Sequence, residues 1–113
     1  VIHFGGSEYS MIEALDYLNL EGILLDSMRI RSFPFNDEVD NFITSHDLVF
    51  VVEQNRDAQM KKLLLAESKA NPSSDKLIPV LCFDGMPITA EFISSAIIKF
   101  LSEKKIKEIL KEK

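Results

Sequence analysis

Apolar residues along the chain fall into short runs that alternate with stretches in which they recur every three or four positions. Short apolar runs are typical of strands, and the three-to-four spacing is typical of helices with one buried face. The pattern predicts strands over 1–4, 23–30, 48–52 and 77–83. It also predicts a helix after each strand, the last of which continues into the amphipathic segment 104–113.

Capping residues indicate where these helices begin and end. Ser7, Asn36 and Thr89 each precede a helical pattern and carry a side-chain oxygen that can accept from the first free amides. Gly22 follows the first helix as a residue in the left-handed conformation would. We expect the third helix to start at about Asp57, which would cap it.

The strand order follows from two features of the sequence. The run 48–52 is apolar throughout, which is typical of a parallel strand covered on both faces. Pro79 removes a ladder donor from the last strand and is tolerated mainly at an edge. With right-handed crossovers, both features are satisfied by an α/β fold, a three-layer α/β/α sandwich whose four-stranded, mainly parallel sheet has the order 2-1-3-4.

In this topology the strand order reverses between strands 1 and 3, and a ligand or partner is expected at the carboxyl ends of those strands. The residues that follow the two strands are Gly5, Gly6, Ser7, Glu53, Gln54 and Asn55. The segment 5–7 lacks the spacing of a dinucleotide fingerprint and the Lys of a phosphate loop. A simple turn and helix cap is therefore favoured over an anion site at the helix N-terminus.

The segment 53–59 is unusually polar for a loop that follows a buried strand. One interpretation is structural: Asp57 caps the third helix, while Asn55 and Gln59 hydrogen-bond loop carbonyls. The other is an interface loop in which Arg56 makes bidentate bonds to carboxylates of another subunit or domain.

A pair of arginines is expected at the same edge of the sheet. Arg29 and Arg31 lie at the end of the second predicted strand, so the parallel topology places them on the carboxyl side together with the loop after the third strand. The candidate contact residues of this edge are Gly5, Gly6, Ser7, Arg29, Arg31, Gln54, Asn55, Arg56 and Gln59.

Composition limits the number of domains and the kinds of partner. A chain of 113 residues with 46% hydrophobic residues predicts one domain over 1–113. A net charge of −5 argues against nucleic acid, and no apolar stretch approaches the roughly 18 residues of a membrane span. Because Val1 already begins a strand without an initiator Met, we expect the chain to be a domain excised from a larger subunit.

Metal and redox chemistry find little support in the sequence. Cys82 is the single cysteine and lies in an apolar run, so it is expected to be a small buried side chain. His3 and His46 lie far apart without a nearby thiol and are expected to be structural rather than metal ligands. The lack of a disulfide pair and of an export signal fits a cytoplasmic location.

The end of the chain, 102–113, is expected to form a protruding helical tail. Glu103 and Lys107 are spaced as an ion pair, and Ile106, Ile109 and Leu110 form a narrow apolar stripe. A solvated helix extension is the default interpretation. Packing against a partner helix explains the stripe better than membrane binding, because the charges are balanced and no aromatic residue anchors it.

Three blocks of sequence resemble the α subunit of 2-oxoacid:ferredoxin oxidoreductases, in the same order and with similar spacing. They are MRIRSFPF at 28–35, FVVEQNRDAQ at 50–59 and FDGMPIT at 83–89. The resemblance covers essentially the whole chain, and the middle block, within 47–64, is the most specific. Its NRDAQ form favours 2-oxoglutarate-type enzymes. The matching part of that family is the C-terminal domain, which is similar to that of transketolase.

The resemblance implies a role inside an enzyme. The family catalyses oxidative decarboxylation of a 2-oxo acid to an acyl-coenzyme A with reduction of ferredoxin, and uses thiamine diphosphate with Mg, iron–sulfur clusters and coenzyme A. It implies that none of these cofactors binds to this domain, that no catalytic residue lies here, and that the isolated domain is inactive. The implied partners are the β subunit and the other domains of the oxidoreductase, with ferredoxin and the 2-oxo acid serving the complex.

Two other classes stay open from the sequence. The chain could be a freestanding anion- or nucleotide-binding α/β module that uses 5–7, or the C-terminal domain of another transketolase-like enzyme. Nucleic acid and membranes are not expected as partners in any of these interpretations.

Overall fold

The computed structural model describes residues 1–5, 8–31, 33–82 and 88–111, with side chains up to 108. Within them, strands and helices alternate along the chain, as the apolar pattern predicts. The elements are β1 (Ile2–Phe4), α1 (Glu8–Leu20), β2 (Met28–Ile30), α2 (Asp37–Thr44), β3 (Val49–Glu53), α3 (Gln59–Glu67), a 3₁₀ turn (Ser74–Lys76), β4 (Leu77–Leu81) and α4 (Ala90–Lys111).

The four strands form one parallel sheet in the order β2-β1-β3-β4. This order and the α/β fold confirm the prediction made from the sequence. β3 lies inside the sheet and all five of its residues are buried. Pro79 lies in β4, paired with Val51 across the ladder, and β4 is an edge strand as the missing donor requires.

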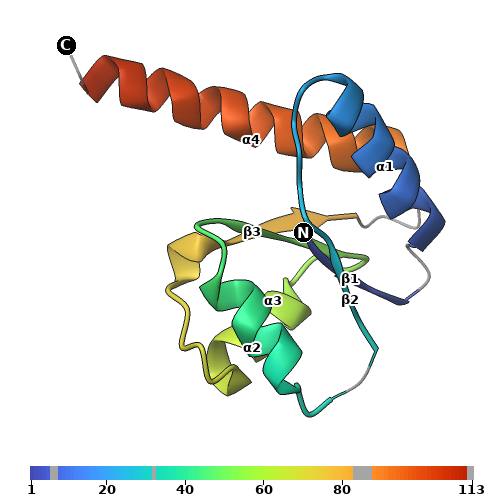
Figure 1. Cartoon of the computed structure of the whole chain (residues 1–113), viewed down its shortest axis with the longest axis vertical. Coiled ribbons are helices and arrows are strands. Elements are labelled where there is room, and N and C mark those ends of the chain that lie inside the picture. Colours follow the sequence, from blue (N-terminus) through green and yellow to red (C-terminus); the bar gives the residue numbers. More distant parts are fainter. Residues whose placement is uncertain (6–7, 32, 83–87, 112–113) are drawn as a thin grey trace.

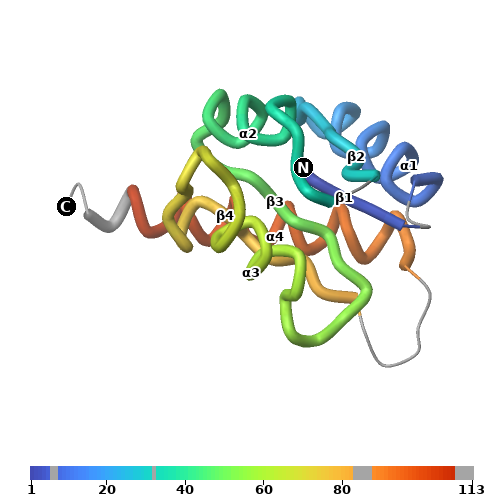
Figure 2. Tube along the Cα trace, turned by 90° about the horizontal axis from the view of Figure 1, so that it is seen from below, coloured from blue at the N-terminus to red at the C-terminus, as the bar shows by residue number. Residues whose placement is uncertain are grey.

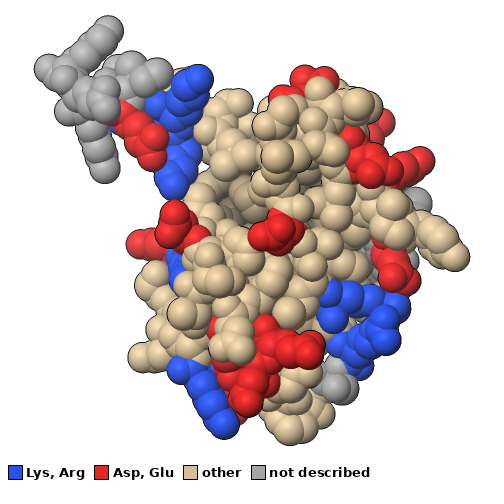
Figure 3. All heavy atoms as spheres, viewed as in Figure 1, with Lys and Arg blue, Asp and Glu red and all other residues tan. Residues whose placement is uncertain are grey.

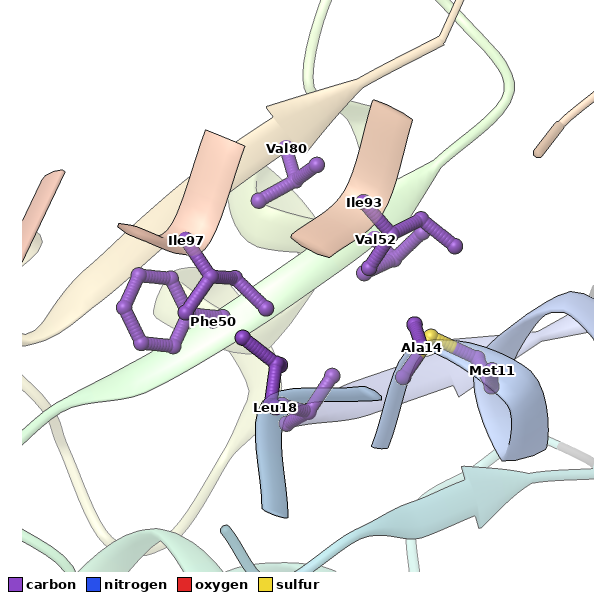
Figure 4. Packing of buried hydrophobic residues seen from close by; sticks show 9 residues of the cluster. Met11, Ala14, Leu18, Phe50, Val52, Val80, Ile93 and Ile97 are labelled. Atoms are coloured by element: carbon purple, nitrogen blue, oxygen red, sulfur yellow. The ribbon is translucent and has the colours of Figure 1, made fainter. Parts of the chain in front are cut away.

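Helices cover both faces of the sheet (Figure 1): α1 and α4 lie on one side, and α2 and α3 on the other. Each pair closes its own apolar core. The α1/α4 core is built on alternate residues of β3 and β4, as Figure 4 shows, and its labelled members are Met11, Ala14, Leu18, Phe50, Val52, Val80, Ile93 and Ile97. The α2/α3 core contains Ile2, Ile30, Val39, Ile43, Val49, Val51, Leu64 and Leu77.

Most of the predicted helix boundaries are confirmed. Asn36 Oδ1 accepts from the Val39 amide at 3.2 Å, and Thr89 Oγ1 accepts from the Phe92 amide at 3.1 Å. Gly22 has φ +83° and closes α1, while the Ile23 amide reaches back to the Leu18 carbonyl at 2.8 Å. The predicted cap Ser7 lies outside the described residues.

The second strand is shorter than predicted. It covers Met28–Ile30 rather than 23–30. β2 is an edge strand whose neighbour β1 has only three residues, so the preceding residues have no ladder to join. Ile23 and Leu25 instead pack against the α1/α4 core. Ile23 and Leu25 are half-buried and Leu24 is 79% exposed, so the apolar residues of this segment predicted a longer strand than the sheet pairs.

The last helix is long and only partly covered. α4 has 22 residues, which corresponds to about 33 Å at the rise of an α-helix. Its first half packs beside α1, and its last turns run past the sheet in both views (Figures 1 and 2). Residues 102–108 are exposed.

The two-core architecture predicts a large cost for truncating a central side chain. Ile97 is fully buried in the α1/α4 core, so Ile97→Ala should lower the free energy of unfolding by about 2–4 kcal/mol. Leu24 is 79% exposed, and Leu24→Ala should change it by less than about 0.5 kcal/mol. Urea unfolding followed by circular dichroism measures both values, and equal losses would contradict the assigned core.

Candidate functional site

A buried carboxylate organises the carboxyl end of β3. The last strand residue, Glu53, is 1% exposed. Its Oε1 accepts from the Met60 amide at 2.6 Å, and its Oε2 accepts from the Lys61 amide at 3.1 Å. These amides belong to the first turn of α3, which has no partners of its own for them. Glu53 therefore caps α3 from the neighbouring strand and places a negative charge at the positive end of the helix.

Asn55 completes this arrangement. Its Nδ2 donates to Glu53 Oε1 at 2.9 Å, and its Oδ1 accepts from the amides of Asp57 and Gln59 at 3.2 Å each. The predicted structural role of Asn55 is thus present, with backbone amides rather than carbonyls as its partners. The loop after β3 is held by side chains that belong to the strand and the loop itself.

The predicted cap of the third helix is wrong. α3 begins at Gln59, and the position before it is Ala58, in the left-handed conformation at φ 51° and ψ 49°. Ala58 has no side-chain oxygen, and Asp57 is exposed. The amides of the first turn are satisfied by Glu53 and Asn55 instead, because the buried carboxylate needs donors as much as the helix needs acceptors.

Three polar side chains of this segment have no structural task within the described residues. Gln54, Arg56 and Gln59 are exposed, and their side chains make no hydrogen bond or ion pair there. Glu53 and Asn55 hydrogen-bond the backbone of the loop and of the first turn of α3, and these three side chains extend from that segment into solvent. Their use as contact residues stays a prediction.

Arg29 and Arg31, on either side of the last residue of β2, do not act as a pair. Arg29 donates from Nη1 to Glu8 Oε2 and from Nη2 to the Gly5 carbonyl, each at 3.1 Å, and so ties the turn after β1 to the neighbouring strand. Arg31 is exposed and makes no such bond within the described residues. Figure 3 shows basic side chains gathered beside β2. Arg31 is the one free to meet a partner.

The glycine turn after β1 is described only in part. Gly5 has φ +69°, a conformation that favours glycine. Gly6 and Ser7 lie outside the described residues. The anion-site alternative for 5–7 therefore stays a prediction.

A shallow hollow of about 250 Å³ lies at the carboxyl ends of β1 and β2 beside α3. Its lining is mostly apolar, with one guanidinium: Phe4, Gly5, Ile30, Arg31, Phe33, Phe35, Met60 and Leu63. Phe33 is 56% exposed and its ring stands edge-on to Phe35 with centroids 5.4 Å apart. Such a hollow suits an apolar side chain of a partner that also offers a carboxylate to Arg31.

A second hollow, of about 370 Å³, continues this surface along the free edge of β2. It is lined by Met28, Arg29, Ile30, Arg31, Asn36, Glu38 and Val39. Both hollows share Ile30 and Arg31, so the carboxyl edge next to β2 is a continuous concave surface. The sequence reasoning placed the arginines here and missed the aromatic pair, although the FPF run at 33–35 directly after a strand was a visible signal.

The remaining titratable side chains have structural roles. His3 is buried, and burial followed by the nearby positive charge of Arg29 lowers the pKa of its imidazole. Cys82 is buried as predicted, and burial raises the pKa of its thiol. In the described part of the chain no three His, Cys, Asp or Glu side chains gather where a metal ion could be held. No described helix has the length and apolarity to cross a membrane.

His46 links two distant segments. Its Nδ1 lies 2.7 Å from the Phe42 carbonyl and its Nε2 lies 2.7 Å from Asp26 Oδ2. The bond to Phe42 and then the bond to Asp26 raise the pKa of the imidazole, because the protonated ring can donate from both nitrogens.

Comparison with known proteins gives one informative likeness. No protein-family model matches the chain, and no curated protein matches it. Its fold is similar to part of a solved 2-oxoglutarate:ferredoxin oxidoreductase from Magnetococcus marinus, a structure with 2-oxoglutarate, coenzyme A and succinyl-CoA bound. The TM-score is 0.73 with 26% identity over 87% of this chain. The match spans 17% of that protein's chain, so this chain corresponds to a small part of it.

The capping role of Glu53 predicts a specific loss of stability. Glu53→Ala leaves three partly buried donors without this acceptor and should lower the free energy of unfolding by about 2–4 kcal/mol. Glu53→Gln keeps one acceptor oxygen and should cost less. Glu67→Ala, at an exposed position of the same helix, is the matched control. Equal losses for Glu53→Ala and Glu67→Ala in urea unfolding would refute the capping role.

The raised pKa of His46 predicts a pH-dependent contribution to stability. The contribution is fully present below the ordinary pKa of 6.5 and disappears as the pH rises through the higher folded-state pKa. The unfolding free energy lost in His46→Gln should therefore be larger at about pH 5 than at about pH 9. Unfolding curves of both proteins at the two pH values measure this, and a loss that does not change with pH would contradict it.

Proposed function

We propose that the chain is the C-terminal, transketolase-like domain of the α subunit of a 2-oxoacid:ferredoxin oxidoreductase, and that it acts in assembly rather than in the reaction. The observation that carries this proposal is the structural likeness to the 2-oxoglutarate enzyme over 87% of the chain. The sequence blocks at 28–35 and 50–59 support the same family. The NRDAQ form of the middle block supports 2-oxoglutarate as the substrate of the parent enzyme.

The residues of this chain do not fit the cofactors of that chemistry. An iron–sulfur cluster needs several thiolates, and the sequence has one cysteine. The described residues also offer no carboxylate and imidazole group for Mg. In this proposal thiamine diphosphate with Mg, the clusters and coenzyme A are held by other parts of the parent enzyme, and the isolated domain is inactive.

The carboxyl edge of the sheet is the surface that we assign to assembly. Glu53 and Asn55 hold the loop after β3, and Arg56 has no hydrogen-bond or ion-pair partner among the described residues. On the β2 side, Arg31 borders an apolar hollow next to the exposed ring of Phe33. A guanidinium binds a carboxylate with two hydrogen bonds, and a half-buried aromatic ring supplies apolar area, the combination typical of interface anchors.

The partners proposed for this edge are the β subunit and the other domains of the same oxidoreductase. Ferredoxin and the 2-oxo acid would meet the assembled complex rather than this domain. We expect this domain and its partner to associate faster at low salt than at high salt. Guanidinium–carboxylate contacts at the rim of an interface raise the association rate, and salt screens them. A cytoplasmic location is part of the same proposal, and the single cysteine without a disulfide partner fits a reducing compartment.

The proposal is tested by reversing charge at the edge in the assembled oxidoreductase. Arg31→Glu combined with Arg56→Glu should raise the dissociation constant between the subunits at least about tenfold, because two attractive contacts become repulsive. Sedimentation velocity over a dilution series measures this. Activity lost on dilution should return at the protein concentration that restores assembly.

The matched control is Lys69→Glu combined with Lys99→Glu, which changes the net charge equally at exposed positions away from this edge. The control should assemble as the unmodified protein does. Unchanged assembly of the arginine variant, or activity that stays low after assembly is restored, would rule out the assembly role. Submillimolar binding of coenzyme A, thiamine diphosphate or inorganic phosphate to the isolated chain would favour the freestanding binding module instead.

A further inference from the structure

The outward side of α1 carries four large apolar side chains that are open to solvent. Tyr9 and Leu20 are each 87% exposed, Ile12 is 53% exposed and Tyr17 is 49% exposed. They are half of the eight large apolar side chains that the described part of the chain exposes. Large exposed apolar groups gathered on one helix are typical of a contact surface rather than of scattered surface residues.

These apolar side chains surround two carboxylates. Residues four apart are neighbours on a helix, so the exposed side of α1 consists of two adjacent rows, each with an acid between two apolar residues. The rows are Tyr9, Glu13 and Tyr17, and Ile12, Asp16 and Leu20. Glu13 and Asp16 are exposed, and neither makes an ion pair within the described residues. We call these two rows the α1 face.

A hollow beside the first row adds a third carboxylate. It has a volume of about 500 Å³, lies between α1 and the start of α4, and is lined by Glu13, Tyr17, Ala90, Glu91, Ser94 and Ser95. Glu91 is exposed and also has no ion-pair partner in the described part of the chain. The segments 8–22 and 88–98, which supply this surface, contain no Lys or Arg. Figure 3 shows acidic side chains gathered over α1.

The charge of the α1 face restricts what can cover it. A second copy that docked its own α1 face here would bring Glu13 and Asp16 against the same carboxylates, and like charges that face each other repel. An anionic lipid surface would be repelled for the same reason. A small hydrated cation would leave the apolar rows in water. A protein surface with Lys or Arg among apolar side chains matches both features.

We infer that the α1 face and the adjoining hollow bind a basic, partly apolar surface of another subunit or domain of the parent enzyme. A guanidinium or ammonium group of that partner lies in the hollow with Glu13 and Glu91, beside the ring of Tyr17. In this position it binds carboxylates and contacts an aromatic face. Apolar side chains next to it cover the two rows of α1.

The identity of the partner rests on the proposed function, but the surface is a different one. The hollow beside α1 shares no lining residue with the two hollows of the carboxyl edge. The domain would therefore be held in the parent enzyme at two places. Exposed guanidinium groups meet carboxylates of a partner at the carboxyl edge, and carboxylates of this chain meet cations of a partner at the α1 face.

Carboxylate labelling tests the contact in the assembled oxidoreductase. A carbodiimide with glycine ethyl ester should modify Glu13, Asp16 and Glu91 several-fold more slowly in the complex than in the chain alone, because the partner covers them. Glu67 and Asp75, which are exposed outside α1 and α4, are the reference positions. Equal modification of the three carboxylates in both states would overturn the inference. Protection that appears only as the concentration of the isolated chain rises would indicate a second copy and would overturn it too.

Removal of the charge separates a cationic partner from a purely apolar one. Glu13→Gln combined with Asp16→Asn should raise the dissociation constant of the complex at least about tenfold and make it less sensitive to salt. Glu67→Gln combined with Asp75→Asn removes the same charge elsewhere and should change neither property. Circular dichroism checks that both variants are folded. A folded Glu13, Asp16 variant that assembles as the unmodified protein does would show that no cation is bound there.

Two aromatic residues distinguish this inference from the proposed function. In hydroxyl-radical footprinting, Tyr9 reports on the α1 face and Phe33 on the carboxyl edge. Protection of Phe33 without Tyr9 in the complex would overturn the inference and keep the role of the carboxyl edge. Protection of Tyr9 without Phe33 would support the inference and overturn that role. A chain that does not associate with the oxidoreductase subunits would overturn both.

Discussion

The burial of β3 on both faces is the constraint on which the rest of the structure depends. Its five residues lie between β1 and β4. Phe50 and Val52 pack in the α1/α4 core, and Val49 and Val51 pack in the α2/α3 core. The last of these buried residues is an acid, so its charge must find donors inside the fold. Glu53 finds them in the loop and at the start of α3, and the position of that helix is fixed by the same contact.

This solution has a consequence for function. Glu53 and Asn55 supply the acceptors for the first amides of α3, and the side chains of Gln54 and Arg56 are exposed. Arg56 is then available to a partner, next to a concave edge that contains Arg31 and Phe33. The assembly role proposed for this edge rests on its exposed guanidinium and apolar hollow, which are suited to contact with another protein surface.

The sequence was sufficient for the architecture because its strongest signals are local. The apolar run 48–52 and Pro79 restrict the places of two strands and, with right-handed crossovers, favour the observed order. Gly22, Asn36 and Thr89 mark the ends of helices. The predictions that were wrong concern features set by contacts between distant residues. The cap of α3 comes from a residue six positions before the helix, and the length of β2 is set by its neighbour, so local preference predicted neither.

We propose that other parts of an oxidoreductase bury the carboxyl edge of the sheet. Hydroxyl-radical footprinting of Phe33 measures this burial. The ring is 56% exposed in this chain and should be oxidised readily when the chain is alone. In the assembled complex the account predicts strong protection of Phe33, with Leu24 as an exposed reference on another surface. Equal oxidation of Phe33 alone and in the complex would contradict the account.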